Sequence, residues 1–204
     1  HSKCWSAEDE KPVADVLNEL KDLLRVPVFA LGASSGGMFV SSNLPGTDLK
    51  LSGYVSEIAA PRRLAESVPA VFITMNRDSR TDEKAAQAVE RLGDLGVRSK
   101  HTRLEPLSLV ASFFTDRIGE TYSSERSSLM VQALHRQSFL SSDGRLTEDP
   151  RRTNWRSILR EQAVDDKLIA DASPISEVLN VAWGYHEMTR DGVAEALDFL
   201  LSEN

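Results

Sequence analysis

The sequence predicts an α/β fold, a doubly wound and mostly parallel sheet with a helical insertion before the last helix. Short apolar runs alternate with amphipathic segments in the first half of the chain, and this alternation is typical of parallel sheets with helices on both faces. From Glu105 to about Ala172 the pattern changes to helical segments around one short hairpin. We therefore assign residues 1–104 and 173–204 to the core, and residues 105–172 to a helical insertion or lid-like subdomain.

The first predicted elements are a helix and the strand that follows it. Ser6 and Asp9 have the spacing of a capping box, which marks the start of the helix. Apolar residues recur at helical spacing from Val13 to Leu24, and Pro27 ends the helical region. The continuous apolar run from Val26 to Leu31 predicts a strand buried on both faces, as in parallel sheets.

The alternation continues with two more strands and a helix. Leu49 to Val55 and Ala70 to Met75 predict further strands, each preceded by a proline. Asp82 to Leu95 predicts an amphipathic helix, and the polar stretch from Val97 to Leu104 predicts a strand near the sheet edge. Later helices are predicted over Ser127–Leu140, over Trp155–Ala170 and over the last segment, which carries Val193, Leu197, Leu200 and Leu201 on one face.

Composition and charge exclude several classes of function. The 204 residues carry a formal net charge of −7 at pH 7, and 41% of them are hydrophobic, as in ordinary soluble domains. No apolar run approaches the roughly 18 residues that cross a bilayer, and no targeting segment is visible, so we expect a soluble chain without assigning its compartment. An acidic chain without a lysine-rich block does not favour nucleic-acid binding. The single cysteine, Cys4, excludes an internal disulfide and a cysteine-based zinc site.

The most informative segment is a turn of small residues, Gly-Ala-Ser-Ser-Gly-Gly, at positions 32–37. It follows the first predicted strand and precedes a helix-like segment. Gly32, Ser34 and Gly36 fit the nucleophile elbow, Gly-x-Ser-x-Gly, in which a serine occupies a strained strand-to-helix turn. Its small neighbours allow close backbone approach, and the N–H of Ser35 is the predicted oxyanion donor.

Two other interpretations of this turn stay open. Similar turns bind the cofactor in short-chain dehydrogenases, and Glu57 lies at a suitable distance to meet a ribose hydroxyl. The long helix before the turn and the lack of a Tyr-x-x-x-Lys pair count against this nucleotide-binding interpretation. Alternatively, the small residues serve only the packing of a helix against a strand.

The order of the remaining candidates favours the elbow, because in elbow enzymes an acid and then a histidine follow the serine. Asp78 comes directly after a buried strand, where open α/β sheets keep their functional groups. Glu57 is the fallback acid, and Asp82 fits better as the cap or first turn of the next helix. His186 lies in a loop directly before the last helix, whereas His101 falls in a polar strand. Turn chemistry for Asp78 and simple loop packing for His186 are the structural alternatives.

Three segments resemble the α/β-hydrolase superfamily: Val26 to Gly37, the strand that ends at Asp78, and the loop of His186 with the final helix. The six-residue turn and a late His-Glu-Met-Thr are similar to those of uncharacterised plant and algal hydrolase-like proteins. The resemblance implies a serine hydrolase of carboxylic-ester type, with Ser34, Asp78 and His186 as its triad and a small-molecule acyl substrate. No metal or organic cofactor is expected, since no cluster of histidines and acids has ligand spacing.

The sequence departs from this family in two ways. The early strands are missing, and with them the early loop that supplies a second oxyanion N–H. We therefore expect His1 to be a cut end and the chain to be the C-terminal portion of a larger hydrolase. The insertion fills the long gap between Asp78 and His186, where it could cover the site or contact a protein partner. A catalytically silent module for binding or scaffolding is therefore the main alternative function. A local basic stripe in the insertion suits a solvated helix face better than nucleic acid; it comprises Arg145, Arg151, Arg152, Arg156 and Arg160.

Overall fold

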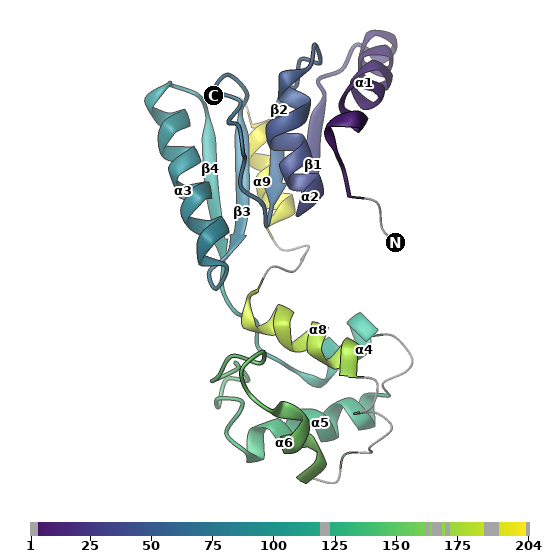
Figure 1. Cartoon of the computed structure of the whole chain (residues 1–204), viewed down its shortest axis with the longest axis vertical. Coiled ribbons are helices and arrows are strands. Elements are labelled where there is room, and N and C mark those ends of the chain that lie inside the picture. The colour runs from purple at the N-terminus through teal and green to yellow at the C-terminus, as the bar shows by residue number, and fades with distance from the viewer. Residues whose placement is uncertain are drawn as a thin grey trace. The chain divides into compact units, whose positions relative to one another are not determined.

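The computed structural model describes residues 4–118, 123–161, 164, 169, 172–185 and 192–202. The chain divides into two compact units, which we treat separately (Figure 1). The first comprises His1–Leu104 with Met188–Asn204, and the second comprises Glu105–Glu187. The second boundary therefore lies later than the one expected after residue 172, because helix α8 (Ala172–Trp183) packs in the core of the second unit.

The described part of the first unit contains one four-stranded sheet in which every strand pairs in parallel with its neighbour. Parallel neighbours need a crossover connection, and the segments between the strands run over the sheet to provide it. The predicted α/β fold with a parallel sheet is confirmed. In sheet order the strands are β1 (Phe29–Ala33), β2 (Gly53–Glu57), β3 (Ala70–Met75) and β4 (Ser99–Leu104).

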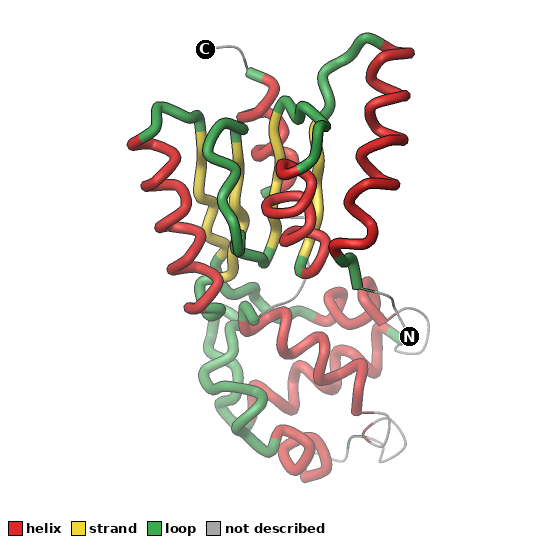
Figure 2. Tube along the Cα trace, turned by 45° about the horizontal axis from the view of Figure 1, so that its top comes forward, coloured by secondary structure: helices red, strands yellow, loops and turns green. Residues whose placement is uncertain are grey.

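Helices cover both faces of this sheet, as a doubly wound fold requires (Figures 1 and 2). Tyr54 and Phe72 point to one face, and Val55 and Ile73 point to the other, because side chains alternate along a strand. The first face packs against α1 (Glu10–Leu24), η2 (Phe39–Asn43), η3 (Leu44–Gly46) and α3 (Ser79–Asp94). The second face packs against α9 (Val193–Leu201).

The first strand corrects one prediction. The run from Val26 to Leu31 was expected to form a strand buried on both faces, but β1 starts at Phe29 and is one of the two edge strands of the described sheet. Leu31 is accordingly 48% exposed. A continuous apolar run indicates a strand in a parallel sheet, but it does not tell a central strand from an edge strand. The edge position predicted for the polar strand β4 is confirmed.

The second unit is built from helices around its own apolar core. Fully buried members of this core include Phe114, Met130 and Leu134. The short hairpin expected here is a single antiparallel bridge between Leu140 and Leu146. No helix among the described residues is long and apolar enough to cross a membrane. The described helices are α4 (Ala111–Ile118), α5 (Ser124–Arg136), α6 (Trp155–Glu161) and α8.

Candidate functional site

Ser34 lies in a tight turn between β1 and the short helix α2 (Ser35–Met38). Its backbone has φ 52° and ψ −117°, a region that residues with a side chain rarely occupy. Two hydrogen bonds hold it there: the Ser34 N–H donates to the Glu57 carbonyl at 3.0 Å, and the Ser34 carbonyl accepts from the Met38 N–H at 3.0 Å. Such strain persists only where the surrounding structure enforces it, so the turn is a built feature of this sheet edge.

Two glycines allow the backbone to approach itself closely at this turn. A Cβ added at Gly32 would overlap the Gly36 carbonyl group and lie 2.9 Å from the Gly37 nitrogen. A Cβ at Gly37 would lie 2.8 Å from the Ala59 Cβ and 3.0 Å from the Glu57 carbonyl oxygen. At Gly36 the nearest described atoms belong to the Trp5 side chain, 3.6 Å away. Gly32 and Gly37 are therefore sterically required, whereas Gly36 has room for a methyl group.

An apolar cavity of about 470 Å³ adjoins the turn. Its lining includes Ala33 and Ser35, the two neighbours of Ser34 in the chain. Trp5 also lines it and stacks on Phe39 with 4.9 Å between the ring centroids. The rest of the lining is almost entirely apolar and includes Val13, Leu17, Phe29, Leu31, Val40 and Leu44.

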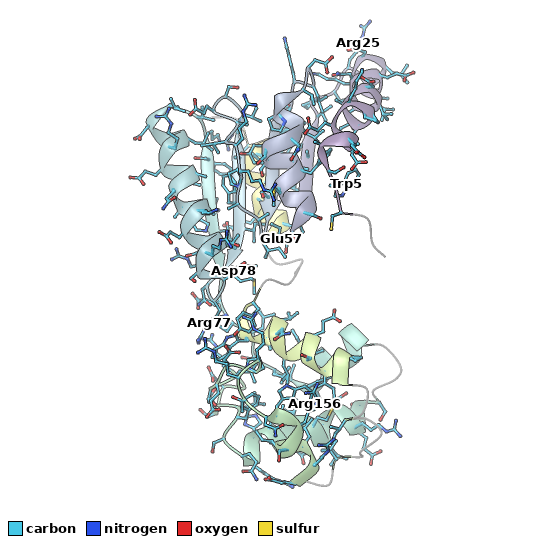
Figure 3. All side chains as sticks on the ribbon, viewed as in Figure 1. Trp5, Arg25, Glu57, Arg77, Asp78 and Arg156 are labelled. Atoms are coloured by element: carbon cyan, nitrogen blue, oxygen red, sulfur yellow. The ribbon has the colours of Figure 1, made fainter. Side chains whose placement is uncertain are left out.

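Both candidate acids lie at the carboxyl ends of strands (Figure 3). Glu57 is the last residue of β2, is 3% exposed, and meets Ser34 through its backbone carbonyl. Asp78 follows β3 and is half-buried at the start of α3, where its N–H donates to the Met75 carbonyl at 3.0 Å. Because parallel strands end at the same sheet edge, both acids share an edge with Ser34. The predicted base, His186, lies outside the described residues.

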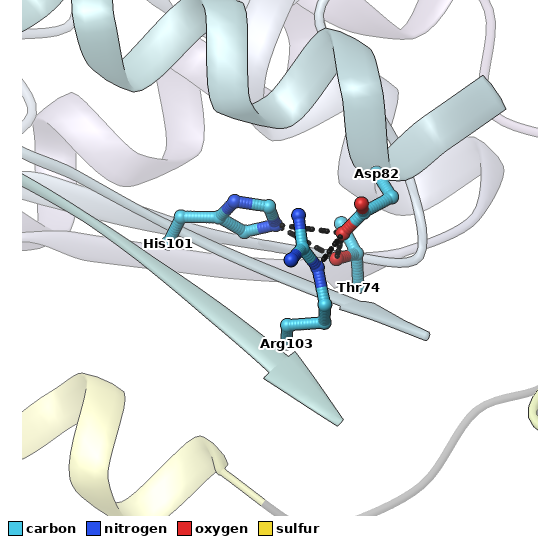
Figure 4. Close-up of polar contacts among 4 residues, drawn as sticks. All are labelled: Thr74, Asp82, His101 and Arg103. Atoms are coloured by element: carbon cyan, nitrogen blue, oxygen red, sulfur yellow. Dashed lines mark hydrogen bonds and ion pairs between the residues drawn. The ribbon is translucent and has the colours of Figure 1, made fainter. Parts of the chain in front are cut away.

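Sequence analysis missed a polar cluster on the same unit, formed by Thr74, Asp82, His101 and Arg103 (Figure 4). The Asp82 Oδ1 accepts hydrogen bonds from the Thr74 hydroxyl and the Arg103 Nε, each at 2.7 Å. The His101 Nε2 lies 2.8 Å from the Thr74 Oγ1 and 3.3 Å from the Asp82 Oδ1. We call this set the Asp82 cluster. The sequence feature that could have indicated this cluster is the presence of polar residues inside two predicted strands. The structure shows that these strands are neighbours and that Thr74 pairs with Arg103.

The cluster shifts the pKa values of two half-buried groups, Asp82 and His101. Burial alone would raise the pKa of Asp82, but hydrogen bonds from Arg103 and Thr74 and the charge of Arg103 outweigh it and lower that pKa. Burial lowers the pKa of His101; the Asp82 charge opposes this shift and the Arg103 charge adds to it. The imidazole is therefore neutral and the carboxylate ionised near neutral pH.

Mild acid is expected to destabilise this unit partly through His101. Since its pKa is lowered from 6.5 in the folded state, the unfolded chain binds more protons just below that pH. The contribution of His101 to the free energy of unfolding is fully present above pH 6.5, and it is lost as the pH falls through the folded-state pKa. Urea unfolding at about pH 7.5 and about pH 5.5 should show a larger loss in the wild type than in His101→Gln. Equal losses in the two proteins would contradict this assignment.

Comparisons with known proteins leave the family open. No protein-family model matches the sequence, and no curated protein sequence matches it. Among solved structures, the chain is similar to a thermostable esterase, with 17% identity and a TM-score of 0.36. The match covers 47% of this chain and 28% of the esterase chain. A likeness this low does not establish an activity for this chain. Within the described residues, no group of three or more histidine, cysteine or acidic side chains could hold a metal ion.

Proposed function

We propose that this chain is a serine hydrolase that acts on an ester or a similar acyl substrate. The observation that carries the proposal is the backbone of Ser34, which is strained between a parallel strand and a helix. Close packing at Gly32 and Gly37 enforces the turn that exposes a serine in this way. Strain of this kind costs about 1–3 kcal/mol and is concentrated at functional sites, which plain helix–strand packing does not explain.

In the proposed reaction the Ser34 Oγ attacks the ester carbonyl carbon while His186 takes the hydroxyl proton. The Ser35 N–H donates to the oxygen that becomes negative in the tetrahedral intermediate. The intermediate then loses the alcohol, which leaves with the proton from His186, and the acyl group stays on Ser34. Water repeats these steps and releases the acid. Asp78 holds the imidazole in the right tautomer and balances its positive charge.

The cavity beside the turn supports a substrate with an apolar acyl group. Its lining includes Ala33 and Ser35, the residues before and after Ser34, together with the apolar side chains of Leu17, Phe29 and Phe39. Burying a methylene group in such a lining contributes about 0.8 kcal/mol to binding. A substrate with an apolar acyl chain therefore suits the site better than a charged one.

A fluorophosphonate probe tests the proposal, because it bonds covalently to an activated serine oxygen and releases fluoride. We expect the folded wild-type chain to be labelled on Ser34 and the Ser34→Ala variant to be unlabelled. Ser35→Ala is the matched control, since it removes the neighbouring hydroxyl but keeps the backbone N–H that binds the oxyanion. This control should be labelled like the wild type.

Two outcomes would contradict the enzymatic role. One is a folded wild-type chain that takes up no probe, and the other is labelling that persists in Ser34→Ala. The first outcome would favour a catalytically silent module that uses the same fold for binding. Circular dichroism of each variant shows whether the sheet and helices are intact, so that lost labelling is not mistaken for lost structure.

A further inference from the structure

We propose that Asp82 is a positioning residue, which fixes the turn that presents Asp78 to the site. The inference rests on the proposed function, in which Asp78 supports His186. Sequence analysis gave Asp82 only the role of a helix cap or a first-turn acid. The structure gives its carboxylate a set of partners on the sheet, and these partners carry the argument.

The backbone connects Asp82 directly to Asp78. Both lie at the start of α3, and the Asp82 N–H donates to the Asp78 carbonyl at 2.9 Å. The Thr81 N–H donates to the same carbonyl at 3.1 Å. A displacement of the first turn of α3 would therefore move the peptide unit of Asp78 with it.

The side chain of Asp82 anchors that turn to the sheet. Its Oδ1 accepts from the hydroxyl of Thr74, which is fully buried in β3, and from the Nε of Arg103 on β4. The Nε2 of His101, also on β4, lies 3.3 Å from the same Oδ1 (Figure 4). The carboxylate thus joins the start of α3 to two adjacent strands. The buried Thr74 gives this connection a rigid end, because a packed strand moves less than a helix terminus.

A simple interaction with the helix dipole does not need this geometry. Any acid in the first turn of a helix is stabilised there, and Asp82 is the acid in the first turn of α3. Glu83 follows it directly in the helix and is exposed. Asp82 bonds to residues of two strands, whereas the described hydrogen bond of Glu83 is with Gln87 in the same helix. Glu83→Gln is therefore a matched control, since it removes one negative charge from the next position of the same helix and leaves the Asp82 cluster unchanged.

The expected consequence is a misplaced Asp78. Asp82→Asn weakens the pairing with Arg103, and Thr74→Val removes the hydroxyl donor without changing the side-chain shape. Small displacements of a supporting group can cost up to about a hundredfold in rate, so we expect the rate constant for fluorophosphonate labelling to fall about 10- to 100-fold in both variants. Thr74→Ser keeps the hydroxyl and should restore most of the rate.

The pH profile of labelling separates positioning from a loss of structure. If Asp78 supports His186 less well, the pKa of the histidine falls, and the acid limb of the profile between about pH 5 and pH 9 moves to lower pH. A purely structural defect would lower the labelled fraction and leave the shape of the profile unchanged. Wild-type rate and profile in Asp82→Asn, or a reduced labelled fraction alone, would overturn the proposal.

Amide hydrogen exchange gives a readout that does not depend on activity. The N–H groups of Thr81 and Asp82 should exchange faster in Asp82→Asn than in the wild type or in Glu83→Gln. If the wild type is never labelled on Ser34, the proposed function fails and the role in catalysis fails with it. If the wild type is labelled but exchange and labelling are unchanged in Asp82→Asn, only the positioning role is overturned.

Discussion

Replacing Asp78 by asparagine is expected to lower the rate constant for ester hydrolysis by about 10⁴-fold, the loss that the same change causes in a serine-protease triad. Asparagine keeps the size of the side chain and the backbone hydrogen bonds at the start of α3. It removes the charge that stabilises the imidazolium, and it allows the wrong tautomer of His186. The measurement is kcat with p-nitrophenyl acetate, together with the rate of fluorophosphonate labelling.

Glu57→Gln is the matched comparison, because Glu57 is the other candidate for the acid of the triad. Its contact with Ser34 uses the backbone carbonyl, which the substitution leaves in place. If Asp78 is the acid of the triad, Glu57→Gln should keep a rate within about tenfold of the wild type. The opposite result, a large loss in Glu57→Gln and a small one in Asp78→Asn, would assign the acid to Glu57. Equal and small losses would leave neither acid in a triad.

The sequence was informative where a property is local. The run Ala70 to Met75, apolar except for Thr74, forms the fully buried strand β3, because a strand covered on both faces favours apolar residues at successive positions. The strand-to-helix turn at Ser34 was also predictable, since the pattern of small residues around the serine reflects its own backbone. Both predictions depend on residues that are neighbours in the chain.

Properties that depend on pairing between distant segments were not predictable. The edge position of β1, and with it the exposure of Leu31, follows from which strands become neighbours. The Asp82 cluster likewise requires the register that sets Thr74 opposite Arg103. Taken singly, its members suggest only a polar strand and a helix start. The steric requirement for glycine at Gly37 was not predictable from the motif either, because it depends on Ala59 and the Glu57 carbonyl, which are distant in the sequence.

Gly32 and Gly36 lie on either side of Ser34, and the second prediction with a large expected effect compares an alanine substitution at each of them. Gly32→Ala is expected to lower the free energy of unfolding of the first unit by about 3 kcal/mol, at the upper end of the cost of overpacking. The added methyl would overlap the Gly36 carbonyl, whose atoms belong to the backbone, so no flexible side chain can move away to relieve the overlap. Either β1 or α2 has to shift, and the strained turn at Ser34 lies between them.

Gly36→Ala is the control for this experiment, because it adds the same methyl group two residues after Ser34. Its new Cβ would make ordinary contact with Trp5, and a helical position gains about 0.4–1 kcal/mol when glycine becomes alanine without strain. Urea unfolding followed by circular dichroism should therefore separate the two variants by more than about 3 kcal/mol. Equal stability would mean that β1 and α2 do not approach as closely as described. Probe labelling should follow the same order, lost in Gly32→Ala and kept in Gly36→Ala, because the strain at Ser34 depends on that approach.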